Sequence, residues 1–224
     1  MEFVIYSQIT AQSLSSEHWP FNNGQLDVPD NAITWPQITD NNPDSANPSA
    51  ATNSNQVQSQ ATNNLQPITT QWQMNKIAAH IKYSRHTHLI LHTGFIATRE
   101  QLSSGVLLHL NSLADTENKN SSATDDDNNK TTDNSSTAQQ ISANGLVYIN
   151  LKKYFNMRFN FIIAAPTTDL LNIYDKWNQN RYWGEYSYFH LLSQRRMKSR
   201  ELNYIDSPIA GILVFVTPIT DDQG

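Results

Sequence analysis

The chain has 224 residues, a formal net charge of −5 and no cysteine. This composition excludes disulfide bonds, thiolate catalysis and thiolate metal sites, and the length allows one domain or at most two. No stretch reaches the roughly 18–20 consecutive apolar residues that a membrane-spanning helix needs.

Two polar segments, residues 37–68 and 114–142, consist mainly of Asn, Ser, Thr, Asp, Gln and Ala. They hold too few apolar side chains to offset the entropy of ordering, so we predict two disordered inserts within a single domain over residues 1–224. The inserts carry net charges of −2 and −4. The remainder is therefore nearly neutral, and the overall charge does not identify a partner.

The N-terminal segment 3–9 is rich in β-forming residues and predicts the first strand. A loop follows over residues 15–20. Trp19 and Trp35 each precede a proline. We predict that both pack against the sheet, and stacking on sugar rings is the alternative.

Residues 69–84 are predicted to form the main helix, with Thr70 as its N-cap. A shorter capped helix is predicted over 168–177, and residues 99–101 are predicted to be a polar turn. The remaining apolar segments predict strands. One face of the main helix is predicted to carry Trp72, Ile77, His80, Ile81 and Ser84. The predicted strands are 87–97, 105–110, 145–164 (one bent strand or two), a strand leading from 182–189 into residue 195, and 209–218.

These elements predict an α+β fold in which an antiparallel sheet of about five to seven strands carries one main and one minor helix. A ferredoxin-like arrangement is one option, and the sequence leaves the strand order open.

The most informative segment runs from residue 195 to 208, because four cations within six residues lead by a turn into a buried strand. One interpretation is an exposed strand edge whose cations discourage aggregation. The other is a surface for an anionic partner held on rigid backbone. The nearly neutral remainder argues against nucleic acid as that partner. The four cations are Arg195, Arg196, Lys198 and Arg200.

The same segment resembles the C-terminal signature of the CsiV family of periplasmic peptidoglycan-binding proteins. This chain differs from the family signature at three positions: Lys198 replaces an arginine, and Asn203 and Ser207 replace histidines. Outside the signature, Asn156 replaces a third family histidine. Weaker similarities cover 145–156 and Leu91-His92-Thr93. The residues that match the signature are Arg195, Arg196, Met197, Ser199, Glu201, Leu202, Tyr204, Asp206, Pro208 and Gly211.

The resemblance implies a non-catalytic protein that binds peptidoglycan and supports a class A penicillin-binding protein and its lipoprotein activator. It also implies a periplasmic location, and we expect that a signal peptide is missing from this sequence. No cofactor is predicted. Arginine forks suit stem-peptide carboxylates and aromatic rings suit sugars, so the predicted binding residues are Arg195, Arg196, Lys198, Arg200, Tyr204, Asp206, Tyr186 and Tyr188.

Two alternatives remain. The protein is a protein-only structural adaptor of the cell envelope if the arginines are buried in internal salt bridges. It is a metal-binding protein or enzyme if His86, His88 and His92 gather on one strand face. Hydrolase motifs and glycine-rich phosphate loops are absent from the sequence. Asp206 is expected to accept backbone N–H groups in the turn before Pro208, and Glu201 to pair with an arginine.

Overall fold

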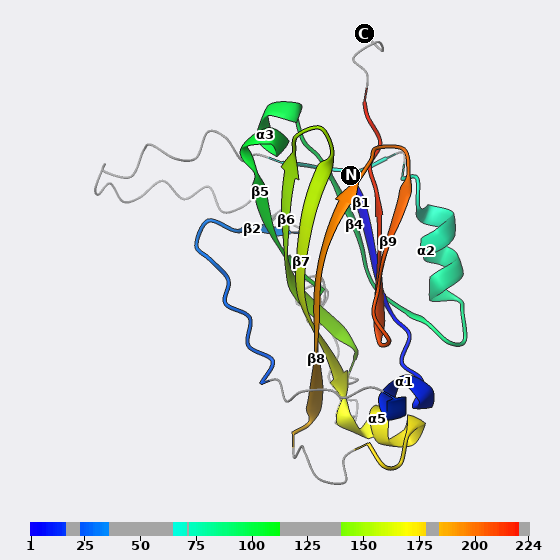
Figure 1. Cartoon of the computed structure of the whole chain (residues 1–224). Helices are drawn as coiled ribbons and strands as arrows, with labels where there is room; N and C mark the ends of the chain where they lie inside the picture. The colour runs from blue at the N-terminus through cyan, green and yellow to red at the C-terminus, as the bar shows by residue number, and fades with distance from the viewer. Residues whose placement is uncertain (17–22, 36–64, 71, 113–139, 178–183, 220–224) are drawn as a thin grey trace, which may run out of the picture.

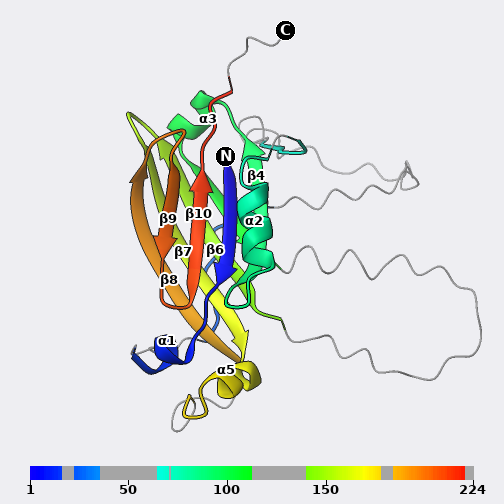
Figure 2. The same cartoon turned by 90° about the vertical axis from the view of Figure 1, so that its right-hand side faces the viewer.

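The computed structural model describes residues 1–16, 23–35, 65–70, 72–112, 140–177 and 184–219. Ten strands form two five-stranded sheets that face each other (Figures 1 and 2). Sheet A contains, in order, β3 (Gln66–Pro67), β4 (His88–Ile96), β1 (Glu2–Ser7), β10 (Ala210–Phe215) and β9 (Leu202–Asp206); sheet B contains β2 (Ile33–Trp35), β5 (Val106–Asn111), β6 (Ser142–Leu151), β7 (Phe155–Pro166) and β8 (Tyr186–Met197).

The α+β class is confirmed, but the strands divide between two sheets where we expected one. Pairing is antiparallel throughout except between β2 and β5. The element order does not follow the β-α-β-β-α-β sequence of a ferredoxin-like fold. The described helices are α1 (Ala11–Ser16), α2 (Asn75–Lys82), α3 (Arg99–Ser104) and α5 (Thr167–Ile173).

The central strands β1 and β10 of sheet A are buried on both faces, whereas its edge strands β3 and β9 are largely exposed. All six residues of β1 are buried, because alternate side chains serve two different cores. Phe3 and Ile5 point into the main core between the sheets, whereas Val4 and Tyr6 pack beneath α2. Figure 2 shows α2 lying along the outside of this sheet. The burial of every residue of this strand, including the polar Glu2 and Ser7 at its ends, is therefore explained by its place in the middle of three layers.

Sheet B is buried on one face and polar on the other. Its strand β5 alternates strictly between buried and half-buried residues, and Phe159, Phe161 and Phe189 point into the main core. We call the face directed away from sheet A the outer face of sheet B. Trp35, on the edge strand β2, is 1% exposed and its Nε1 donates to the Thr93 hydroxyl at 2.9 Å. Its predicted packing role is confirmed.

The main helix is shorter than predicted, because its N-terminus is fixed by a residue far away in the sequence. The buried Glu2 carboxylate accepts hydrogen bonds from the backbone N–H groups of Gln73 at 2.7 Å and Met74 at 2.9 Å. These are donors that the start of a helix leaves unpaired. The helix therefore begins at Asn75, and Thr70 does not cap it.

Other element boundaries also differ. The predicted turn at 99–101 is the start of α3, where Thr98 and Gln101 form a reciprocal capping box. Part of the predicted loop at 15–20 belongs to α1. Both predicted inserts have ordered ends, since Leu65 is buried, β3 pairs with β4, and β6 begins at Ser142. The rest of both inserts, and Trp19, lie outside the described residues.

None of the described helices is both long and apolar enough to pass through a lipid bilayer.

Candidate functional site

The four predicted cations lie where the chain passes from one sheet to the other. Arg195 and Arg196 are near the end of β8, and Lys198 and Arg200 lie in the connection to β9, at the end of the molecule that also carries α3 (Figure 1). Buried Met197 is opposite Phe155 on β7, which fixes this end of β8. All four cations are exposed.

The connection between β8 and β9 holds an unusual backbone conformation. Arg200 has a φ of 63°, the left-handed region that non-glycine residues rarely adopt. Its backbone N–H donates to the Val216 carbonyl at 2.8 Å, so the turn is tied to the end of β10. Strained backbone of this kind collects at functional sites, and here it fixes the position of a cation.

Adjacent arginines on β8 point to opposite faces. Because side chains alternate along a strand, Arg195 shares the face of Met197 that turns toward sheet A, and Arg196 lies on the outer face of sheet B. The Arg196 guanidinium lies 4.8 Å from the centroid of the Tyr154 ring, within the range of a cation–π interaction. The two arginines therefore cannot contact the same group of a ligand.

None of the four cations is held in a buried salt bridge within the described residues. Lys198 lies 3.7 Å from Glu201, and both side chains are more than half exposed, so this ion pair contributes little stability. The expected partner of Glu201 was an arginine, and the structure pairs it with Lys198. Within the described residues, no hydrogen bond or ion pair involves the side chains of Arg195 and Arg200.

The fold brings further cations to this end of the molecule that sequence reasoning missed, and three of them lie on β7 or in the turn before it. Lys152 and Lys153 lie in the β6–β7 turn next to Phe155 and its partner Met197, and Arg158 follows on β7, exposed. The doublet Lys152-Lys153 in a hairpin turn was a visible signal, but only strand pairing places it beside the β8–β9 connection. We call this set the basic end: Lys152, Lys153, Arg158, Arg195, Arg196, Lys198 and Arg200.

Tyr204 and Asp206 lie on β9, on the α2 side of sheet A. The Tyr204 hydroxyl donates to Asp206 at 2.6 Å, and the Gln8 side-chain amide donates to Asp206 at 2.7 Å and to the Ser207 carbonyl at 2.7 Å. Asp206 therefore binds side-chain donors and not the backbone N–H groups that we expected. Burial of the phenol, followed by its hydrogen bond to Asp206, raises the pKa of Tyr204.

Tyr186 and Tyr188 do not join the arginines. They lie eight to ten residues before Arg196 on the same strand, which corresponds to roughly 26–33 Å at about 3.3 Å per residue. Tyr188 instead packs against Gly24, so closely that a Cβ atom added to Gly24 would lie 2.6 Å from the Tyr188 ring. The predicted single site is thus divided among the basic end, the β9 surface and the far end of β8.

The three histidines are also separated. A shift in register between β1 and β4 at Ile5/Tyr6 interrupts the strand alternation. His92 lies beside the Trp72 ring, 4.7 Å between centroids, and 3.7 Å from Glu2. His86 precedes β4, and His88 is exposed at its start. Within the described residues, no group of three or more His, Cys, Asp or Glu side chains is placed to hold a metal ion.

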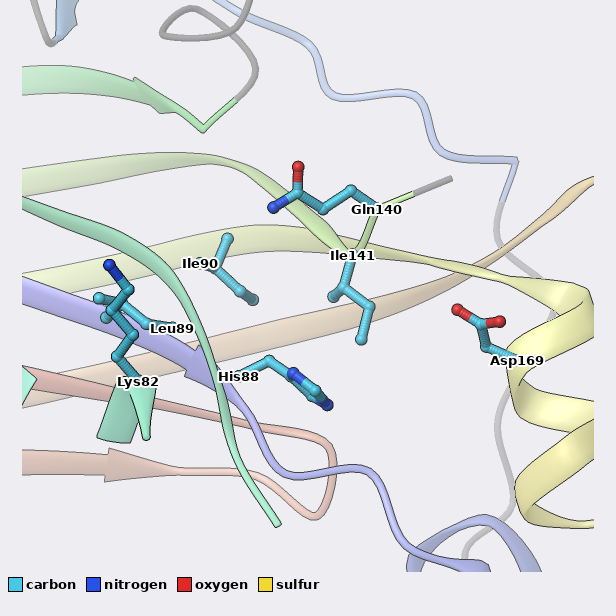
Figure 3. A pocket seen from close by; sticks show the side chains of 7 residues that line it. All are labelled: Lys82, His88, Leu89, Ile90, Gln140, Ile141 and Asp169. Atoms are coloured by element: carbon cyan, nitrogen blue, oxygen red, sulfur yellow. The ribbon is translucent and has the colours of Figure 1, made fainter. Parts of the chain in front are cut away.

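A cleft of about 360 Å³ lies at the end of the molecule away from the basic end. Figure 3 shows side chains from α2, β4, the start of β6 and α5 around it. No hydrogen bond or ion pair of the described residues joins its charged groups to one another. Its lining residues are Lys82, His88, Leu89, Ile90, Gln140, Ile141 and Asp169.

Asn156, Asn203 and Ser207, the positions where the resembling family has histidine, serve locally in this chain. The Asn156 amide donates to the Tyr154 carbonyl at 3.3 Å, and the Asn203 amide to the Glu201 carbonyl at 2.9 Å. The Ser207 hydroxyl bonds to the backbone of Ala210 across the β9–β10 turn. Each supports a turn beside one of the candidate surfaces.

Comparison with known proteins agrees with the signature at the basic end. The family model described as peptidoglycan-binding protein, CsiV, matches residues 1–219. No curated protein and no solved structure matches the chain. Because the match covers nearly the whole sequence, including both sheets and the β8–β9 connection, the chain belongs to the CsiV family of peptidoglycan-binding proteins.

Proposed function

We propose that this chain is a non-catalytic periplasmic protein that binds peptidoglycan through its basic end. The observation that carries the proposal is that Arg195, Arg196, Lys198 and Arg200 are exposed on backbone fixed by strand pairing. Peptidoglycan presents stem-peptide carboxylates, which arginine forks bind with two parallel hydrogen bonds. The exposed Tyr204, on the separate β9 surface, offers a second, aromatic contact, and Asp206 accepts a hydrogen bond from its hydroxyl.

The exposure of the arginines also bears on the alternative function. A protein-only adaptor would use arginines as buried, paired structural residues, and those of the basic end are exposed. We propose in addition that wall binding lets the protein support a class A penicillin-binding protein and its lipoprotein activator, as the resemblance implies. That role requires a second surface, because the basic end is occupied by the wall.

Co-sedimentation with purified sacculi tests wall binding. The test variant is Arg195→Ala/Arg196→Ala/Lys198→Ala. The charge-matched control is Lys76→Ala/Lys82→Ala/Arg85→Ala, which removes three exposed cations on and beside α2. The parent and both variants must first be shown to melt cooperatively.

The proposal expects the parent and the α2 control to sediment and the basic-end variant to remain largely in the supernatant. If none of the three sediments, the protein does not bind the wall directly and the adaptor function replaces the proposal. If all three sediment equally, wall binding stands but the basic end is not its site.

A further inference from the structure

The outer face of sheet B continues the basic end across three strands. Strand pairing places Tyr148, Arg158 and Gln194 directly opposite one another in one row across β6, β7 and β8. Asn150, Asn156 and Arg196 form the next row. At about 4.8 Å between strands and about 6.8 Å between alternate residues, these rows outline a patch of roughly 10 by 7 Å. We call these six residues the platform.

Two of the three amides of the platform are held by their nitrogen atoms and keep their oxygen atoms available. Asn150 donates its Nδ2 to the Ser103 carbonyl at 3.0 Å, and Asn156 donates to the Tyr154 carbonyl at 3.3 Å. In the part of the chain that the structure describes, no group donates a hydrogen bond to either amide oxygen, and neither oxygen is buried. These two amides are therefore oriented before any ligand arrives, and this lowers the entropic cost of binding.

Arg196 is oriented by an aromatic neighbour. Its Cζ lies over the Tyr154 ring, 4.8 Å from the ring centroid, and its guanidinium N–H groups donate no hydrogen bond within the described residues, so they are available for a planar anion. Arg158 is diagonal to Arg196 across β7 and β8, at a separation of roughly 7–8 Å between β-carbons. All six platform positions are uncharged or cationic. A ligand that matches this face must therefore carry both neutral hydrogen-bonding groups, for the amides, and carboxylates, for the arginines.

We propose that the platform binds the sugar backbone of peptidoglycan together with the carboxylates of the attached peptide. The idea rests on the proposed function and adds to it that the protein recognises the sugar as well as the peptide. N-acetylated sugars offer amide and hydroxyl groups to Asn and Gln side chains, and an apolar ring face to the exposed Tyr148. Arg195, on the opposite face of β8, takes no part in sugar recognition.

Calorimetric titration of the full chain with two soluble fragments tests the proposal. One fragment is a disaccharide carrying a tetrapeptide, and the other is the same tetrapeptide without sugar. The quantity of interest is the ratio of the two affinities. We expect the disaccharide-peptide to bind at least roughly tenfold more tightly than the peptide, since one or two good hydrogen bonds supply such a factor.

The test variant is Tyr148→Ala/Gln194→Ala, which removes the ring and one of the amides assigned to the sugar. The matched control is Tyr83→Ala/Gln12→Ala, at exposed positions away from the platform. The proposal expects the affinity ratio to fall close to one in the test variant and to keep its parental value in the control. If the double variant does not melt cooperatively, Gln194→Ala alone replaces it, and a smaller fall in the ratio is then expected.

Sacculus sedimentation separates this proposal from the function on which it rests. Sedimentation of the parent together with equal affinity for both fragments would overturn the platform and leave wall binding intact. An affinity ratio that persists in the test variant would also overturn it. If the parent neither sediments with sacculi nor binds either fragment, the proposed function itself is overturned.

Discussion

Replacement of Glu2 by glutamine is predicted to destabilise the fold, although the change is nearly isosteric. Glu2 is 2% exposed, and its two carboxylate oxygens accept the N–H groups of Gln73 and Met74. Glutamine retains one acceptor but directs an NH₂ group at a backbone donor, so one buried N–H loses its partner. A hydrogen bond to a charged group contributes about 1.5–3 kcal/mol, and an unpaired buried donor costs a similar amount.

The expected loss in the free energy of unfolding is therefore about 2–3 kcal/mol. For a chain of this size each kcal/mol lowers the Tm by roughly 2–4 °C, which gives a decrease of about 4–12 °C. Thermal unfolding followed by circular dichroism at neutral pH measures this shift. The matched control is Glu100→Gln, which neutralises an exposed acid in the first turn of α3 and is expected to cost at most about 1 kcal/mol. A Tm decrease no larger than the control's would refute the capping role of Glu2.

Two further predictions concern His92 and Arg200. Burial lowers the pKa of His92 from its ordinary value of 6.5, and Glu2 only partly opposes this, so the unfolded chain binds more protons and stability falls as the pH drops below about 6.5. His92→Gln should remove that part of the pH dependence, measured as the difference in urea midpoint between pH 7.5 and 5.5; an unchanged difference would contradict it. Arg200→Asn should leave the Tm within a few degrees of the parent, because asparagine tolerates positive φ, while weakening sacculus binding; a large Tm loss would mean that the arginine side chain is structural.

The sequence by itself determined the element types wherever local periodicity was strong. The β-forming run at 3–9 and the apolar segment at 105–110 were predicted as strands and form β1 and β5, because β-branched, aromatic and apolar residues favour extended backbone. The cationic segment was recognisable in the same way, since its density of charge and its family signature are local features of the chain.

Only the tertiary structure decided how these pieces meet. The division of the strands between two sheets, the capping of α2 by Glu2 and the arrival of Lys152 and Arg158 beside Arg196 depend on pairing between residues far apart in the sequence. Periodicity assigns each side chain to a face, but long-range register decides its neighbours, and for that reason the site required the fold.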